Sequence, residues 1–104
     1  MDAFFALSDP TRRAIVELLA QQGELPASEI AGQFAMSAPA ISQHLKVLRE
    51  ARLVTHEAEG TRRFYRATPQ GLAELRRYIE TLWDDVLTAY AADDPDPPAR
   101  PRTP

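Results

Sequence analysis

The stretch from Ser37 to Ala51, SAPAISQHLKVLREA, constrains the fold of this chain more than any other. On a helix with about 100° per residue, one stripe of it is apolar and has the spacing of a core-facing side: Ile41, Leu45 and Leu48. The opposite side carries small or polar residues: Pro39, Gln43, Lys46 and Glu50, with Ser42 on its flank. Such a helix suits the major groove of DNA, because small residues permit close approach while amide, hydroxyl and cationic groups reach base edges and phosphates.

The residues around this stretch predict a helix-turn-helix. Ser37 is a good N-cap, and Pro39 lies in the first turn, where a missing N–H does no harm. Residues 26–34 predict a helix of two turns that ends near Phe34, and only residues 35–37 separate it from the next helix. Two short helices joined by so tight a turn are typical of this DNA-binding motif.

The period changes after Ala51 and indicates a β-hairpin. Residues 53–58 and 63–67 are rich in strand-forming side chains and flank the segment Glu59-Gly60-Thr61, which favours a tight turn. A hairpin directly after a helix-turn-helix makes a winged helix. The arginines of this wing, Arg62 and Arg63 in particular, are expected to reach the DNA backbone or the minor groove.

Helices are also expected at both ends of the chain. Residues 3–7 predict a short helix, and residues 10–22 predict a second one that is capped by Ser8 or Asp9 and ends before Gly23. Thr68-Pro69 begins a long helix with an apolar stripe over five turns. The first and last helices carry more apolar side chains than so small a domain can cover, so we expect them to form a dimer interface through Phe4, Phe5, Leu7, Ile79, Leu82, Trp83, Val86, Leu87 and Tyr90.

The predicted fold class is therefore mainly α, a winged helix-turn-helix with about five helices and a small β-hairpin. Residues 1–91 are expected to form one DNA-binding and dimerisation domain. Residues 92–104 contain five of the nine prolines and almost no apolar side chain, so they predict an extended or flexible tail.

Composition excludes several other functions. The chain has no cysteine, which removes disulfides, thiolate metal sites and cysteine nucleophiles together. No apolar run approaches the length of a membrane span, and we expect a cytoplasmic protein. Ser42 and His44 would point about 200° apart on one helix and cannot share a proton, and the four glycines form no phosphate loop, so an enzyme is not expected.

The net charge of −3 hides a basic centre. Residues 41–78 hold eight basic and four acidic side chains, whereas the segments before and after them are acidic. The basic excess thus surrounds the proposed recognition helix and wing, which is the local footprint expected of a nucleic-acid binder. Solvated helix and strand faces would also account for it.

Three segments together resemble the ArsR/SmtB family of winged-helix repressors: FFALSDPTRRAIVELL, ELPASEIAGQFAMSAPAISQHLKVLREARLV and EGTRRFYRATPQGLAEL. The resemblance implies a homodimer that binds double-stranded DNA at inverted-repeat operators and represses its own operon. It also implies that bases are read by the first half of the second helix of the motif, here Ala38, Pro39, Ser42 and Gln43, with Ser37 at the cap. Arg52 stands where relatives usually have glycine, which costs on the order of 1 kcal/mol if that site needs a positive φ; it would also place a positive charge near phosphate.

The resemblance implies no metal site and no cofactor in this chain. Metal sensors of the family use a CxC-type motif in the region that reads ELPASEI here, or Asp and His pairs on the last helix, which has no histidine in this chain. The inducing signal, whether a small molecule or a protein, is not readable from the sequence.

Alternatives remain for the two histidines and for the whole domain. His44 lies at the edge of the buried stripe, where a bond to a neighbouring helix or loop and a phosphate contact both fit. His56, on the first wing strand, is expected at the surface. The competing function is a winged helix used for protein contact, with the long last helix as its binding surface. The basic wing and the small polar recognition face favour DNA.

Overall fold

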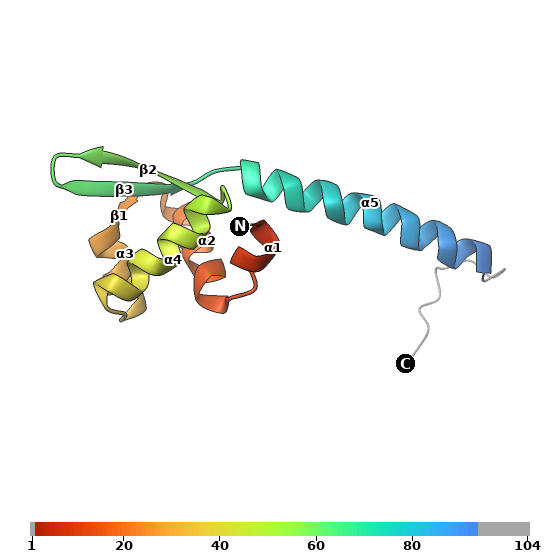
Figure 1. The fold of residues 1–104 in the computed structure, drawn as a ribbon, viewed down its shortest axis with the longest axis horizontal. Helices are drawn as coiled ribbons and strands as arrows, with labels where there is room; N and C mark the ends of the chain where they lie inside the picture. Colours follow the sequence, from red (N-terminus) through yellow and green to blue (C-terminus); the bar gives the residue numbers. More distant parts are fainter. Residues whose placement is uncertain (1, 94–104) are drawn as a thin grey trace. The chain divides into compact units, whose positions relative to one another are not determined.

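The structure, a computed structural model, describes residues 2–93, and the chain divides into two compact units, Met1–Glu74 and Leu75–Pro104. Within the described residues the elements are, in chain order, α1 (Ala3–Ala6), α2 (Pro10–Gln22), β1 (Leu25–Pro26), α3 (Ala27–Phe34), α4 (Ala38–Glu50), β2 (Val54–Glu59), β3 (Arg62–Ala67) and α5 (Gln70–Asp93). Figure 1 shows α3 and α4 joined by a short turn, with the β2–β3 hairpin beside them. This confirms the predicted winged helix-turn-helix.

Side-chain caps set where α2 and α4 begin. The Asp9 carboxylate accepts a 3.0 Å hydrogen bond from the Arg12 backbone N–H, a bond that also lowers the pKa of Asp9, and Pro10 follows at the first helical position. The Ser37 hydroxyl accepts from the Ala40 N–H at 3.3 Å and begins α4. The sequence predicted Ser37 as one cap and left Ser8 or Asp9 for the other, and the structure selects Asp9. Such caps are visible in the sequence because the side chain and its N–H lie only three residues apart.

Two non-glycine residues with positive φ end the helices of the motif. Ala35 (φ 51°) ends α3, and Arg52 (φ 59°) follows α4. Around Arg52 the backbone N–H of Leu53 donates to the Leu48 carbonyl at 2.9 Å. This is the hydrogen bond of a helix C-terminal cap in which one residue adopts the left-handed conformation. Position 52 does have a positive φ, so the condition under which arginine was expected to cost about 1 kcal/mol there is met.

The wing is part of a three-stranded antiparallel sheet with the order β1-β3-β2. Its register pairs Glu59 with Arg62, so that Gly60 (φ 65°) and Thr61 form a two-residue turn. The strands extend one residue further toward this turn than the sequence predicted. Strand β1 pairs with β3 at Tyr65 and Phe64.

The core lies in the first unit and joins α2, α3, α4 and the base of the wing. Its largest fully buried side chains are Ile15, Leu19, Ile30, Ile41, Leu45, Leu48 and Leu53. On α2 the third buried residue is Val16, and Leu18 is half-buried. On α1 the buried residues are Ala3 and Ala6, and both phenylalanines are exposed.

Helix α5 begins in the first unit and continues through the second. Gly71 fixes its start: the Gly71 N–H donates to the Arg52 carbonyl at 2.8 Å, and a Cβ at Gly71 would lie 2.5 Å from the Ala51 carbonyl oxygen. The helix begins at Gln70, one residue after Pro69, the predicted first helical position, and includes Ala92 and Asp93. Residues 94–104, the rest of the predicted tail, lie outside the described residues. None of the helices in residues 2–93 is long and apolar enough to span a membrane.

Candidate nucleic-acid interface

Helix α4 presents to solvent the face that the sequence predicted as its outward side. The exposed residues in and around its first half are Ser37, Ala38, Pro39, Ser42, Gln43 and Lys46, while Ile41, Leu45 and Leu48 are at most 1% exposed. The periodicity alone located this division. The first two exposed turns therefore carry short side chains and one amide, with a lysine one turn further along.

The wing arginines are split by the alternation of the strand. Successive residues of a strand point to opposite faces, so Arg63 shares a face with Tyr65 and Arg62 shares the other with Phe64. The Arg62 guanidinium carbon lies 5.2 Å from the centre of the Phe64 ring, a cation–π distance that restrains this side chain. The sequence treated these two arginines as equivalent, and the structure gives them different surroundings.

A hollow of about 310 Å³ brings the recognition helix and the wing together. It is lined by Pro26, Ala27, Ser28, Ser42, Thr61, Arg62, Arg63 and Tyr65. Three of these residues were predicted to bind DNA, and no acidic side chain is among the described residues of the lining. Sequence reasoning missed Ser28 and Thr61, because their place beside Ser42 depends on how α3 and the wing turn pack against α4.

His44 makes the bond to a neighbouring helix that was one of its two predicted roles. Its Nδ1 lies 3.4 Å from Nη1 of Arg12 on α2. Arg12 also donates to the backbone of α1, from Nε to the Ala6 carbonyl at 2.7 Å and from Nη2 to the Phe5 carbonyl at 3.3 Å. The predicted phosphate contact of His44 stays a prediction.

The expectation that His56 is simply a surface residue is wrong. Its ring stacks on Tyr65 with centroids 5.1 Å apart, and its Nε2 lies 3.1 Å from Nη1 of Arg49 on α4. Burial lowers the pKa of His56, and the nearby guanidinium groups of Arg49 and Arg63 lower it further. The neutral His56 side chain thus connects the wing to the recognition helix through its contacts with Tyr65 and Arg49. It was missed because the pairing of His56 with Tyr65 is visible only once the strand register is known.

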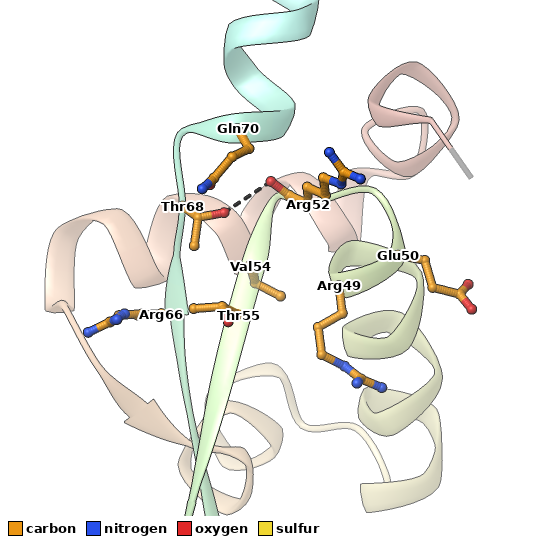
Figure 2. Close-up of a pocket in the computed structure, with 8 residues that line it drawn as sticks. All are labelled: Arg49, Glu50, Arg52, Val54, Thr55, Arg66, Thr68 and Gln70. Carbon is orange, nitrogen blue, oxygen red and sulfur yellow. Dashed lines mark hydrogen bonds between the residues drawn. The ribbon is translucent and has the colours of Figure 1, made fainter.

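A second hollow, of about 640 Å³, lies at the other end of α4. Figure 2 shows it between the last turn of α4, strand β2 and the first residues of α5, with the Thr68 hydroxyl donating to the Arg52 carbonyl. Three arginines are among the lining residues, but the side chains of Arg52 and Arg66 point in opposite directions. The cations therefore do not converge on one point.

The predicted dimer residues are mostly exposed apolar side chains. In the first unit these are Phe4 and Phe5 on α1, about half exposed, while Leu7 is half-buried. In the second unit they are Ile79, Leu82, Trp83, Val86 and Leu87, between 41% and 65% exposed, with Tyr90 half-buried. Within residues 2–93 the structure contains no group of three or more His, Asp and Glu side chains that could hold a metal ion.

These features define a winged-helix protein of the DNA-binding class. The second helix of the helix-turn-helix has a small polar face, the wing is basic, and one hollow is lined by both. Residues 9–56 match the family described as bacterial regulatory protein, arsR family. An HTH-type transcriptional regulator of Mycobacterium tuberculosis is 53% identical over 89 residues, which cover 86% of this chain and 82% of the relative. The chain belongs to the ArsR family and is a winged-helix transcriptional regulator.

Two further relatives place the chain within this family. The transcriptional repressor SdpR of Bacillus subtilis is 41% identical over 64 residues, covering 62% of this chain and 70% of the repressor. The homodimeric winged helix-turn-helix DNA-binding domain of a possible ArsR-family regulator from Mycobacterium bovis, solved by NMR, has a TM-score of 0.60 and 34% identity. That similarity covers 77% of this chain and 73% of the other. The family and these relatives are regulators of transcription and not enzymes.

Proposed function

We propose that this protein is a homodimeric repressor, without catalytic activity, that binds an inverted-repeat operator in double-stranded DNA and controls its own operon. The observation that carries the proposal is the hollow where Ser42 of the recognition helix meets Arg62 and Arg63 of the wing. A polar helix face beside two cationic side chains is what a DNA duplex requires, because phosphate contacts set the register while base contacts specify the sequence.

The exposed face of α4 divides into two parts in this proposal. Ser42 and Gln43 reach base edges in the major groove, and Ala38 and Pro39 make apolar contact, for example with a thymine methyl group. Ser37, at the cap, lies beside them. Lys46, Arg62 and Arg63 contact phosphates or the minor groove, and Ser28 adds a hydroxyl to the same hollow. The phosphate contacts supply most of the non-specific affinity.

A second copy of the chain accounts for the apolar side chains of α1 and α5. Seven of them are at least 41% exposed: Phe4, Phe5, Ile79, Leu82, Trp83, Val86 and Leu87. Burying the exposed half of such a side chain contributes about 1 kcal/mol. Seven side chains from each of two copies can therefore offset an association cost of about 4–15 kcal/mol. The homodimeric state of the relative from Mycobacterium bovis supports the same assembly.

The experiment is a selection of bound duplexes from a random-sequence pool, followed by a footprint of the protein on the promoter of its own gene. We expect a two-fold symmetric sequence with half-sites about one helical turn, or a multiple of it, apart. A Ser42→Glu, Gln43→Glu variant is the control, because both positions are exposed and the change repels DNA without touching the core. Recovery of no preferred sequence by the wild-type protein would favour the competing function, a protein-contact module that uses α5.

A further inference from the structure

Arg12 joins three helices of the first unit through its side chain. Its guanidinium donates to two carbonyls at the end of α1, those of Phe5 and Ala6, and lies 5.2 Å from the centre of the Phe5 ring. The remaining nitrogen, Nη1, faces Nδ1 of His44 on α4 at 3.4 Å. One side chain on α2 thus touches both the helix that carries Phe4 and Phe5 and the recognition helix.

The contact with His44 has a defined chemical direction. Arginine is a donor at every nitrogen, so the Nδ1 of His44 accepts, and the ring proton of the neutral imidazole lies on Nε2. The Arg12 contact therefore favours this tautomer and orients the ring. His44 follows Gln43 directly on α4, so a change at Arg12 reaches the exposed face of this helix through one neighbouring residue.

Helix α1 depends on its caps for its position. It has four residues, and a single helical turn is unstable alone because nucleation fixes several dihedral angles for one hydrogen bond. The Asp2 carboxylate accepts from the Phe5 N–H at its beginning, and Arg12 and Arg13 bind the carbonyls at its end. Whatever packs on Phe4 and Phe5 therefore acts on a helix whose end is held by Arg12.

We propose that Arg12 is a positioning residue that couples α1 to the recognition helix through His44, so that a second copy packed on α1 sharpens the sequence preference of α4. This inference rests on the proposed function, because it needs both a dimer and an operator. It adds a physical connection between dimer and operator. The Arg12 guanidinium contacts both α1, which carries Phe4 and Phe5, and the recognition helix α4.

The chain supplies a matched control in the next residue. Arg13 Nη1 donates to the Leu7 carbonyl at 2.7 Å, so Arg13 also binds the end of α1. Among the hydrogen bonds of residues 2–93, its side chain has none to α4. Arg12→Gln and Arg13→Gln each remove one positive charge and weaken the hold on the end of α1, and only Arg12→Gln removes the contact with His44.

The experiment is a double-mutant cycle on DNA affinity, with protein at concentrations where it is fully dimeric. The variants are Arg12→Gln, Arg13→Gln, His44→Phe and the two doubles with His44→Phe, which keeps an aromatic ring but removes the acceptor. For each variant, affinity is measured for the selected operator and for a scrambled duplex, and thermal unfolding confirms the fold. We expect Arg12→Gln to lower the operator-to-scrambled ratio about fivefold, within the usual range of coupling between sites, and Arg13→Gln less than about twofold.

The cycle also separates coupling from general destabilisation. In the His44→Phe background, Arg12→Gln should have almost no further effect on the ratio, whereas Arg13→Gln should have the same effect as in the wild type. Equal losses from Arg12→Gln and Arg13→Gln, or full additivity of Arg12→Gln with His44→Phe, would overturn the coupling. A wild-type protein without any operator preference would instead overturn the proposed function.

Discussion

Helices α4 and α5 have the same amphipathic pattern in sequence and opposite outcomes in the structure. The apolar stripe of α4 is buried, with Leu48 fully inside the core. The apolar stripe of α5 is exposed: Trp83 is 65% and Val86 is 57% accessible. Both stripes repeat at three and four residues. Periodicity therefore identifies an apolar face and does not say what covers it.

This difference in burial indicates a different role for each helix. The buried stripe of α4 fixes that helix in the first unit, so its polar side is held rigidly toward solvent. The exposed stripe of α5 is a contiguous apolar surface of the kind that marks a protein interface. One chain thus offers a polar surface suited to DNA and an apolar surface suited to a second copy.

The largest expected effect comes from the exposed stripe. Leu82→Glu with Val86→Glu places two charges on it and should give monomers or aggregates. Without the dimer, one of the two half-sites is no longer bound, so operator affinity should fall at least about 100-fold. Sedimentation velocity at micromolar concentration, together with operator binding, measures both effects.

The matched control places the same charges on the polar side of the same helix. Thr81 and Thr88 are exposed and seven residues apart, so Thr81→Glu with Thr88→Glu adds two charges away from the apolar stripe. This variant should remain dimeric and bind the operator. A wild-type protein that sediments as a monomer at micromolar concentration would contradict the role given to α5.

The next effect concerns the basic wing. Arg62→Ala with Arg63→Ala should weaken operator and scrambled DNA alike, roughly tenfold, and flatten the salt dependence by about one unit for each phosphate that is no longer neutralised. Affinities at several salt concentrations measure it. Arg76→Ala with Arg77→Ala on α5 removes the same charge elsewhere and should leave the slope unchanged. An unaltered affinity and slope in the wing variant would mean that the hairpin does not touch DNA.

The smallest effect concerns His56, which connects the wing to α4. The pKa of His56 is lowered in the folded protein below its usual value of about 6.5, so the unfolded chain binds the proton first. The contribution of neutral His56 to the free energy of unfolding should therefore be complete above about pH 6.5. It should be lost as the pH falls through the folded pKa. Urea unfolding at several pH values measures this, and His56→Gln should flatten the profile. The same profile in wild type and His56→Gln would contradict a stabilising role for the buried His56 side chain.

The sequence predicted the elements well because their signals are local. Asp9 and Ser37 cap helices through atoms three residues away, and Gly60 supplies the positive φ of the wing turn. The outward face of α4 followed from periodicity, since the core side of a helix in a small domain has to be apolar. Each of these features depends on neighbours within one or two turns of chain.

The missed features all depend on contacts between distant segments. A bond from His44 to a neighbouring helix or loop was one of two predicted roles, but its partner Arg12 lies 32 residues away and no local pattern identifies it. Ser28 joins the hollow only because α3 packs beside α4 and the wing. The position of His56 beside Arg49 requires both the strand register and the packing of the hairpin on α4. Tertiary packing alone creates these contacts, even where every helix and strand is predicted correctly.

The central claim is that the outward face of α4 reads DNA sequence, and a pair of variants on this face tests it most directly. Gln43 can bond adenine N6 and N7 together, which is worth roughly 1–3 kcal/mol of discrimination, whereas Lys46, one turn on, is placed for phosphate. The measurement is the affinity of Gln43→Ala and of Lys46→Ala for operator and scrambled duplex at one fixed salt concentration. Gln43→Ala should lose affinity for the operator alone, and Lys46→Ala should lose affinity for both duplexes. Equal losses on both duplexes from Gln43→Ala would contradict it and leave Ser42, the Ala38-Pro39 turn or DNA shape to supply the specificity.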